Sequence, residues 1–180
     1  MRVIAGICRS LPLITPEGED TRPTTDRIKE TLFNMIQREI PDCVFYDFFS
    51  GSGGIGIEAL SRGAKHAYFV ENNKKALECI KKNLTFTKLT DQATVVSRDV
   101  LGAIPFLNEK ADVIFMDPPY QLGIEVPVMQ MLKQSGCLKE DTLIIIEADK
   151  NRDFSDITAL GFTLIKEKIY KTNKHVFFSL

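Results

Sequence analysis

The sequence lacks the long apolar runs that mark membrane proteins and secreted precursors. None of its hydrophobic stretches approaches the roughly 18 apolar residues that a membrane-spanning helix needs. Residues 1–13, MRVIAGICRSLPL, hold no continuous hydrophobic segment, so we expect no secretory signal peptide. These absences favour a cytoplasmic protein that does not bind membranes.

Cysteine and histidine are sparse and scattered. No CxxC pair occurs, no histidine stands at metal-ligand spacing, and His66 and His175 belong to no nucleophile motif. We therefore expect no metal, reduced thiols that are buried or partly buried, and histidines with structural or surface roles. The isolated cysteines are Cys8, Cys43, Cys79 and Cys137.

Positive charge is not in excess either. Lys and Arg total 23 against 24 Asp and Glu, which gives a net charge of −1. Proteins that bind nucleic acid generally carry a clear basic excess. The balance therefore argues against a general nucleic-acid binder and leaves a local basic patch open.

What the chain does contain is enough for one globular domain. It has 180 residues, of which 44% are hydrophobic and 26% charged, and it shows no repeats or low-complexity tracts. A chain of this length and composition can bury a full hydrophobic core.

Short apolar runs alternate with helical patterns from residue 43 onward. This alternation predicts a mostly parallel sheet with helices on both faces, a Rossmann-like α/β fold. The tail, residues 161–180, predicts an antiparallel hairpin that turns at 172–174 and completes a seven-stranded sheet. The other strands are predicted at 43–49, 66–71, 93–97, 111–116 and 142–148, and helices at 55–63, 73–88 and 126–136.

The N-terminal part is predicted separately. Residues 1–15 favour two short strands around a turn at 8–10, and residues 16–23 are loop material. We therefore divide the chain into an N-terminal β-hairpin extension, residues 1–23, and a main domain, residues 24–180. The main domain opens with a helix that Thr24 or Thr25 can cap and that Pro41 ends. Its apolar stripe is Ile28, Leu32, Met35, Ile36 and Ile40.

Ligands of such sheets bind at the carboxyl ends of the strands, near the point where the strand order reverses. Four loops there carry conspicuous residues. The first, DFFSGSGGIGIE at 47–58, contains Gly51-x-Gly53-x-x-Gly56, the spacing of a dinucleotide-binding loop. Glycine lets the backbone approach a ligand closely. The spacing alone predicts a nucleoside cofactor without identifying it.

The next two strands end in acids. Glu71 lies 20 residues after Gly51, where an acid can accept hydrogen bonds from both ribose hydroxyls. Ribose is common to nicotinamide dinucleotides and S-adenosylmethionine, so this acid does not separate them. Asp99 can accept the amino group of adenine, with Val100 against the ring, or can cap the helix that follows. Both interpretations of Asp99 stay open.

The fourth loop, MDPPY at 116–120, is the most specific. Its two prolines exclude a helix and fix the direction in which the chain leaves the strand. The Asp117 carboxylate and the Pro118 carbonyl are two acceptors that can hold both hydrogens of an exocyclic amine. Tyr120 supplies a ring on which a base can stack. The motif favours attack by the amino nitrogen of a nucleobase, without a metal or a covalent nucleophile.

Together the four loops resemble those of class I S-adenosylmethionine-dependent methyltransferases. DPPY resembles the motif of the branch that methylates amino groups of adenine, cytosine or guanine. The resemblance implies S-adenosylmethionine as cofactor, and Asp47 can pair with the amino group of its methionine part. The implied cofactor-binding residues are Asp47, Phe49, Gly51, Ser52, Gly53, Glu71, Asn72, Asp99 and Val100, and the implied catalytic residues are Asp117, Pro118 and Tyr120.

Four segments narrow the resemblance to the RsmD family of bacterial methyltransferases. They are MRVIAG at 1–6, TRPTTDRIKETLFNMI at 21–36, DFFSGSGGIGIEALSRGA at 47–64 and DPPY at 117–120. The resemblance implies transfer to guanine N2 in 16S ribosomal RNA, at the position that the family numbers 966. It also implies that the RPTTDR segment borders the active site. The implied substrate-binding residues are Arg22, Thr24, Thr25, Asp26 and Pro119.

The implied partner is 16S ribosomal RNA, and we expect the chain to act as a monomer. Between residues 3 and 15 Arg9 is the only basic residue, although phosphate contacts normally dominate affinity for RNA. We therefore hypothesise that the substrate is an assembled or assembling small ribosomal subunit, whose proteins add contacts. Candidate RNA contacts are Arg2, Arg9, Arg22, Arg27, Lys166, Lys168, Lys171 and Lys174, whereas Lys74, Lys75, Lys81, Lys82 and Lys88 fit the solvated face of a helix.

Three alternatives remain. A DNA adenine-N6 or cytosine-N4 methyltransferase shares DPPY, but no segment here is long enough for a domain that recognises a DNA site. A nicotinamide-binding oxidoreductase shares the glycine spacing but has no use for DPPY. A binding protein that has lost catalysis would not need to keep DPPY intact.

Overall fold

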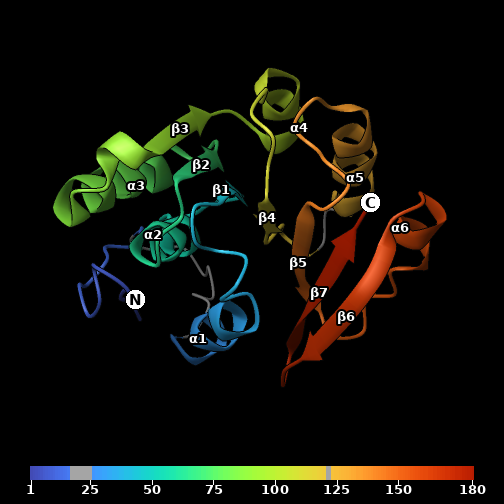
Figure 1. Ribbon diagram of the computed structural model, residues 1–180, viewed down its shortest axis with the longest axis horizontal. Coiled ribbons are helices and arrows are strands. Elements are labelled where there is room, and N and C mark those ends of the chain that lie inside the picture. The colour runs from blue at the N-terminus through green and yellow to red at the C-terminus, as the bar shows by residue number, and fades with distance from the viewer. Residues whose placement is uncertain (17–25, 121–122) are drawn as a thin grey trace.

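A seven-stranded, mostly parallel sheet forms the centre of the protein, as the computed structural model in Figure 1 shows. The structure describes residues 1–16, 26–120 and 123–180. The strands lie in the order β3-β2-β1-β4-β5-β7-β6. Their bounds are β1 Val44–Phe48, β2 His66–Glu71, β3 Ala93–Ser97, β4 Val113–Met116, β5 Leu143–Asp149, β6 Thr163–Ile169 and β7 Asn173–Ser179.

The strand order reverses between β1 and β4. From β1 the chain moves outward to β2 and β3, and it then returns to pair β4 in parallel with the other side of β1. Strand β5 continues the parallel part, and β7 is antiparallel to both β5 and β6. Because parallel strands share one carboxyl edge, the loops after β1, β2 and β4 meet at this reversal.

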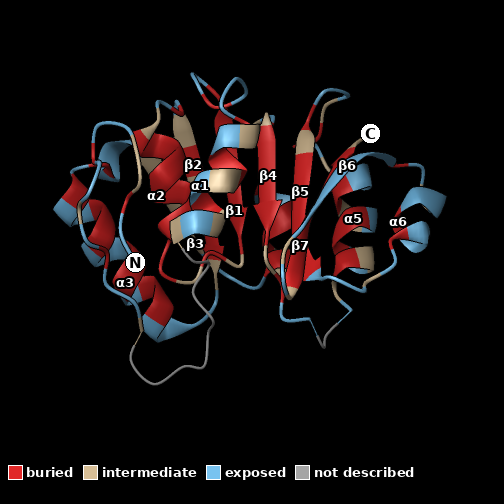
Figure 2. Cartoon of the chain, turned by 90° about the horizontal axis from the view of Figure 1, so that it is seen from below, coloured by how far each residue is buried: buried red, intermediate tan, exposed pale blue. Residues whose placement is uncertain are grey.

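Helices cover both faces of the sheet, and each face has its own apolar core. Residues of α1, α2, α3 and the N-terminal segment form one core, and residues of α4, α5 and α6 form the other. Figure 2 shows the buried central strands between the two layers and β6 exposed at the edge. The helices are α1 Asp26–Met35, α2 Gly54–Ser61, α3 Lys74–Thr87, α4 Val100–Ala103, α5 Glu125–Gln134 and α6 Ser155–Ala159, with 3-10 turns η1 Thr90–Gln92 and η2 Ile104–Phe106.

The predicted fold class is confirmed. Each of the five predicted parallel strands and three helices of the alternating part lies within two residues of an observed element. All four cysteines are buried and free, as predicted. Helix α6 was not predicted, because its five residues are too few to show a helical apolar stripe. Among the described residues, no helix is long and apolar enough to cross a membrane.

The predicted N-terminal hairpin is present but shorter than expected. This segment forms one isolated antiparallel bridge, between Arg2 and Pro12. The Val3 N–H donates to the Leu11 carbonyl at 3.0 Å beside this bridge, so the two arms do pair there. The N–H groups of Ile4 and Ala5 instead donate to the carboxylate of Glu58 on α2, at 2.8 and 3.0 Å. The segment is therefore held both by the pairing of its own arms and by α2.

Two further boundaries differ from the prediction. Helix α1 ends at Met35 and the chain continues in turns to residue 39, although Ile36 and Ile40 are still buried. The proposed caps Thr24 and Thr25 lie outside the described residues. The C-terminal hairpin turns before Asn173, which is already the first residue of β7, rather than at residues 172–174.

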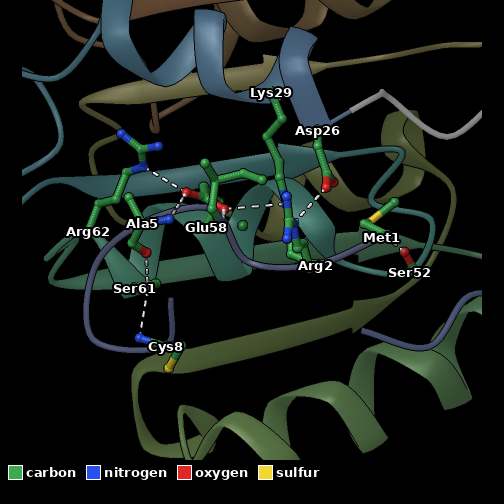
Figure 3. A network of polar contacts seen from close by, with 12 residues as sticks. Met1, Arg2, Ala5, Cys8, Asp26, Lys29, Ser52, Glu58, Ser61 and Arg62 are labelled. Carbon is green, nitrogen blue, oxygen red and sulfur yellow. Dashed lines mark hydrogen bonds and ion pairs between the residues drawn. The ribbon is translucent and has the colours of Figure 1, made fainter. Parts of the chain in front are cut away.

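A buried carboxylate connects the N-terminal segment to the first helical layer (Figure 3). Glu58 is fully buried on α2. Besides the two backbone donors, it pairs with Lys29 Nζ of α1 at 3.3 Å and with Arg62 Nε at 2.7 Å. Lys29 also donates to the Arg2 carbonyl at 2.6 Å. One acid thus fixes α1 and the first residues of the chain against α2.

We expect Glu58→Ala to destabilise the protein by about 3 to 5 kcal/mol, because it leaves a buried lysine and two partly buried N–H groups without their acceptor. Chemical denaturation measures this change. Glu78→Ala, on the exposed face of α3, is the control and should change stability by less than about 0.5 kcal/mol. A loss no larger than that of the control would contradict the role assigned to Glu58.

Candidate active site

A pocket of about 300 Å³ opens at the carboxyl edge of the sheet, where the strand order reverses. This volume is at the lower end of the range for small-molecule sites. It lies where open α/β sheets bind their ligands. The described residues that line it are Met1, Thr15, Pro16, Lys29, Asp47, Phe49, Ser50, Gly51, Ser52, Gly54, Ile55, Glu71, Asn72, Asn73, Ala76, Phe115, Asp117 and Pro119.

The loop between β1 and α2 forms the floor of this pocket. Its backbone is left-handed at Phe49, Gly51 and Gly53, with φ of 59°, 54° and 80°, a conformation that glycine adopts most easily. Gly56 donates its N–H to Asp47 Oδ2 at 2.8 Å. A Cβ at Gly56 would lie 2.4 Å from the ring of Phe69. The third glycine of the motif is therefore required by packing against β2.

Glu71, at the end of β2, holds the same loop from the other side. Its Oε2 accepts the Gly51 N–H at 2.8 Å, and its Oε1 accepts the N–H groups of Asn72 and Asn73 at 2.9 and 2.8 Å. A carboxylate has about four lone-pair sites, so one site is left, on Oε2. Glu71 can therefore accept one further hydrogen bond at the pocket wall, where both ribose hydroxyls were predicted to bind.

Two acids of the pocket are held in unusual electrostatic environments. The pKa of Asp47 is raised to about 8. Burial is the largest cause, the hydrogen bond from the Gly56 N–H lowers the pKa in part, and the charge of Glu71 adds to the rise. Burial also raises the pKa of Asp117 well above its usual range, and Glu147 and Asp47 add to the rise. Both acids therefore retain a proton at a pH where surface acids have lost theirs.

The DPPY loop, which begins with Asp117, follows β4 at the pocket. Asp117 and Pro119 line the pocket, whereas Pro118 is buried beside it. Tyr120 is 45% exposed and does not line the pocket. The motif thus places a carboxyl group inside the pocket and an aromatic ring on the surface next to it.

The structure brings together most of the residues that were predicted to bind a cofactor. Gly53, Asp99, Val100 and Asp26 are described but do not line the pocket. Asp99 is the N-cap of α4 and accepts the Gly102 N–H at 2.8 Å, which is the capping interpretation. The predicted residues that do line it are Asp47, Phe49, Gly51, Ser52, Glu71, Asn72, Asp117 and Pro119, and Arg22, Thr24 and Thr25 lie outside the described residues.

Lys29 is the pocket residue that the sequence analysis missed most clearly. It is 1% exposed and pairs with Glu58. Burial lowers its pKa, and the charge of Glu58 counteracts part of the effect. Lys29 stands three and seven residues before Leu32 and Ile36, on the apolar face of α1. A lysine in an apolar stripe was the available signal.

The basic residues considered in the sequence analysis differ in exposure and in whether they already form an ion pair. The helix lysines 74, 75, 81, 82 and 88 are exposed, as predicted. Lys174 is 6% exposed and pairs with Glu167 at 2.8 Å, so its ammonium is not available to a phosphate. Arg2 pairs with Asp26 at 2.9 Å but its side chain is still 62% exposed.

The fold and the site together define a class I methyltransferase: a sheet of this order, a glycine-rich loop after β1 and a DPPY loop after β4. The chain belongs to the family described as "Conserved hypothetical protein 95", whose model matches residues 1–179. This is the RsmD family.

Similar proteins are known by sequence and by structure. The chain is 38% identical to Ribosomal RNA small subunit methyltransferase D of Haemophilus influenzae over 171 residues, which cover 93% of this chain and 88% of that protein. It is 34% identical to the protein of the same name from Escherichia coli, with 94% and 84% covered. The solved structure of the Escherichia coli yhhF protein matches with a TM-score of 0.88 at 31% identity, covering 99% and 97%.

We expect the ligand-free protein to lose stability as the pH rises from about 4 to about 8, because the pKa of Asp47 is higher in the folded chain than in the unfolded one. The contribution is complete below the unfolded pKa and is lost on passing the folded pKa. Asp47→Asn keeps an acceptor for Gly56 and removes the titration. Thermal denaturation is measured between pH 5 and pH 8. At pH 8 the free energy of unfolding of the variant, relative to that of the wild type, should be a few kcal/mol higher than at pH 5. A constant difference across this range would contradict the assignment.

Proposed function

We propose that the protein transfers a methyl group from S-adenosylmethionine to the exocyclic N2 of a guanine in small-subunit ribosomal RNA. One observation carries the proposal: Asp117 of DPPY lines the same pocket as Asp47 and Glu71. An acceptor suited to an amino group and two acids suited to a nucleoside cofactor thus meet at one opening. The named function of the relatives from Haemophilus influenzae and Escherichia coli supports the RNA substrate.

The charge of the pocket fits a cationic cofactor. Burial raises the pKa of Asp47 and of Asp117, and the charges of neighbouring acids add to both rises. A bound cation would replace those protons and relieve the repulsion. Lys29 is a cation in the pocket wall, but it pairs with Glu58. A nicotinamide dinucleotide would bring a doubly negative pyrophosphate to this acidic wall, so the oxidoreductase alternative is disfavoured.

Each acid has a separate task in this proposal. S-adenosylmethionine supplies an electrophilic methyl group on a positively charged sulfur. Asp47 pairs with the ammonium of the methionine part, and the remaining lone pair of Glu71 accepts one ribose hydroxyl. Asp99 keeps a second carboxylate oxygen, beyond its cap to Gly102, that can accept the adenine amino group.

The acceptor amine is held by the DPPY loop. The Asp117 carboxylate and the Pro118 carbonyl accept its two hydrogens, and Tyr120 stacks on the base at the surface of the protein. Such positioning supplies much of the rate enhancement of a direct transfer. The RPTTDR segment, Arg22 to Arg27, borders the same site in this proposal. An assembled small-subunit particle in the cytoplasm remains the proposed substrate, with the enzyme as a monomer.

Methylation of purified 16S ribosomal RNA, isolated small subunits and DNA with labelled S-adenosylmethionine tests the proposal, with nucleoside mass spectrometry as the readout. We expect N2-methylguanosine, and faster methylation of subunits than of naked RNA. The RNA and the subunits are prepared from cells without the gene, so that the acceptor is unmodified. Label in N6-methyladenine or N4-methylcytosine of DNA would support the DNA alternative instead.

Asp117→Ala should lower kcat by about 100-fold or more, because it removes an acceptor that orients the amine during transfer. Affinity for S-adenosylhomocysteine, measured by calorimetry, should stay within about threefold of the wild type. Glu140→Ala, at an exposed position before β5, is the control for loss of one acid. If Asp117→Ala stays folded but no longer binds the cofactor, Asp117 belongs to cofactor binding rather than to catalysis.

A further inference from the structure

A second acid lies behind Asp117, outside the pocket lining. Glu147 is on β5, which pairs with β4 in parallel so that Met116 lies opposite Ile146. Asp117 and Glu147 are the next residues of the two strands and point to the same face of the sheet. Their closeness is reflected in the pKa of Asp117, which Glu147 raises more than Asp47 does. Glu147 is 5% exposed.

The Glu147 carboxylate is held by two donors from β7. Asn173 Nδ2 donates to Oε1 at 2.6 Å, and His175 Nε2 lies 3.0 Å from Oε2. His175 is fully buried, directly opposite Glu147 in the β5–β7 register. Its Nδ1 lies 3.2 Å from the hydroxyl of Tyr170. A neutral imidazole that donates through Nε2 and accepts the Tyr170 hydroxyl at Nδ1 satisfies both contacts.

The outer end of this chain of contacts stays protonated in the physiological range. Burial, with the charge of Glu147 as a second cause, raises the pKa of Tyr170 to about 12. Tyr170 therefore keeps its hydroxyl proton, which it can donate to Nδ1 of His175. The edge of the His175 ring also meets Phe115, at 6.0 Å between centroids. Glu147 thus has a fixed orientation and accepts hydrogen bonds on both oxygens.

Three titratable groups surround Asp117 on this face of the sheet. Asp47 comes from β1, Glu147 from β5 and Lys29 from α1, and His175 of β7 lies behind Glu147. Lys29 faces Glu58 and the Arg2 carbonyl. Among the neighbouring charges, Glu147 therefore has the largest effect on Asp117. Glu147 itself does not line the pocket.

We propose that Glu147, oriented by Asn173 and His175, is a positioning residue that keeps a negative charge behind Asp117 and thereby makes Asp117 the group that takes the proton lost by the methylated amine. The inference rests on the proposed function, in which Asp117 contacts that amine. It assigns a task to a buried Glu–His–Tyr chain that neither the motif nor the pocket explains.

The proton step balances within the site. The amine gains a methyl group and must lose one proton: its N–H bond breaks, the electron pair stays on nitrogen, and an O–H bond forms at an Oδ atom of Asp117. A bound cationic cofactor keeps Asp117 ionised before the transfer. Once the positive charge of the cofactor has been lost, Glu147 and Asp47 make the carboxylate basic enough to hold the proton. The proton passes to water when the products leave.

The test compares Glu147→Gln with Glu140→Gln, which removes an exposed acid just before the same strand. Glu147→Gln keeps the size of the side chain and an acceptor for Asn173 or His175. Its kcat should fall about tenfold, and the acid limb of its kcat–pH profile should move down by about one pH unit, because Asp117 becomes a weaker base. KM for RNA should stay within about twofold. The Glu140 variant should behave as the wild type in every respect.

A second readout needs no methyl transfer. Calorimetry in buffers of different ionisation enthalpy counts the protons released when S-adenosylmethionine binds. The wild type should release more at pH 7 than Glu147→Gln, because Asp117 of the variant has already lost part of its proton. Unchanged proton release together with an unchanged pH profile would overturn the proposal. So would a simple loss of melting temperature and cofactor affinity with the pH profile unmoved, since this indicates a structural role alone.

The two readouts separate this proposal from the proposed function. If the wild-type protein makes no N2-methylguanosine, the assignment of the substrate fails, while the proton count still tests the electrostatic link from Glu147 to Asp117. If the wild type makes the product and Glu147→Gln matches it in both readouts, only the inference about Glu147 fails.

Discussion

The hydrogen bond from the Gly56 N–H to the Asp47 carboxylate is the contact on which the site depends. It joins the end of β1 to the first turn of α2, at the middle of the sheet and beside the reversal of strand order. Because Gly56 also packs directly under the ring of Phe69, the helix has one position relative to β2. The glycine loop between these elements, with Glu71 on its other side, can therefore have a fixed left-handed path. A buried acid in β1 is costly, and a cationic ligand, as in the proposed function, would offset that cost.

The sequence was informative wherever chemistry depends on local order. Alternating apolar runs give the parallel sheet, and a sheet of this kind places every strand-end loop on one edge. Asp47, Glu71 and Asp117 could be assigned to one pocket because each ends a strand. The same reasoning was less successful for Asp99, since a residue at the start of a helix satisfies capping before any ligand is considered. The N-terminal hairpin is shorter than predicted for a related reason: the N–H groups of Ile4 and Ala5 have an acceptor on α2 that no local pattern indicates.

What sequence reasoning could not reach are interactions between polar groups far apart in the chain. Glu58 and Lys29 are separated by 29 residues, and each looks misplaced in an apolar pattern until the other is known. Glu147 and His175 are 28 residues apart, and the sequence indicated only that Glu147 lies in a strand and that His175 has a structural or surface role. Their meaning comes from the antiparallel insertion of β7 beside β5, which sets the register that pairs them. Buried polar pairs of this kind are specified by topology, which a single sequence shows only indirectly.

The row of acids across β1, β4 and β5 links stability to function. Burial and the charges of neighbouring acids raise the pKa of both Asp47 and Asp117, so the ligand-free protein carries protons that it would release to bind a cation. Any ligand that binds the folded state alone stabilises it, and a cationic ligand does so twice, through its contacts and through the repulsion that it removes. The product of methyl transfer has lost that positive charge, and the repulsion returns. In the proposed reaction, the same arrangement would favour binding of the charged cofactor, uptake of a proton at Asp117 after transfer, and weaker retention of the neutral product.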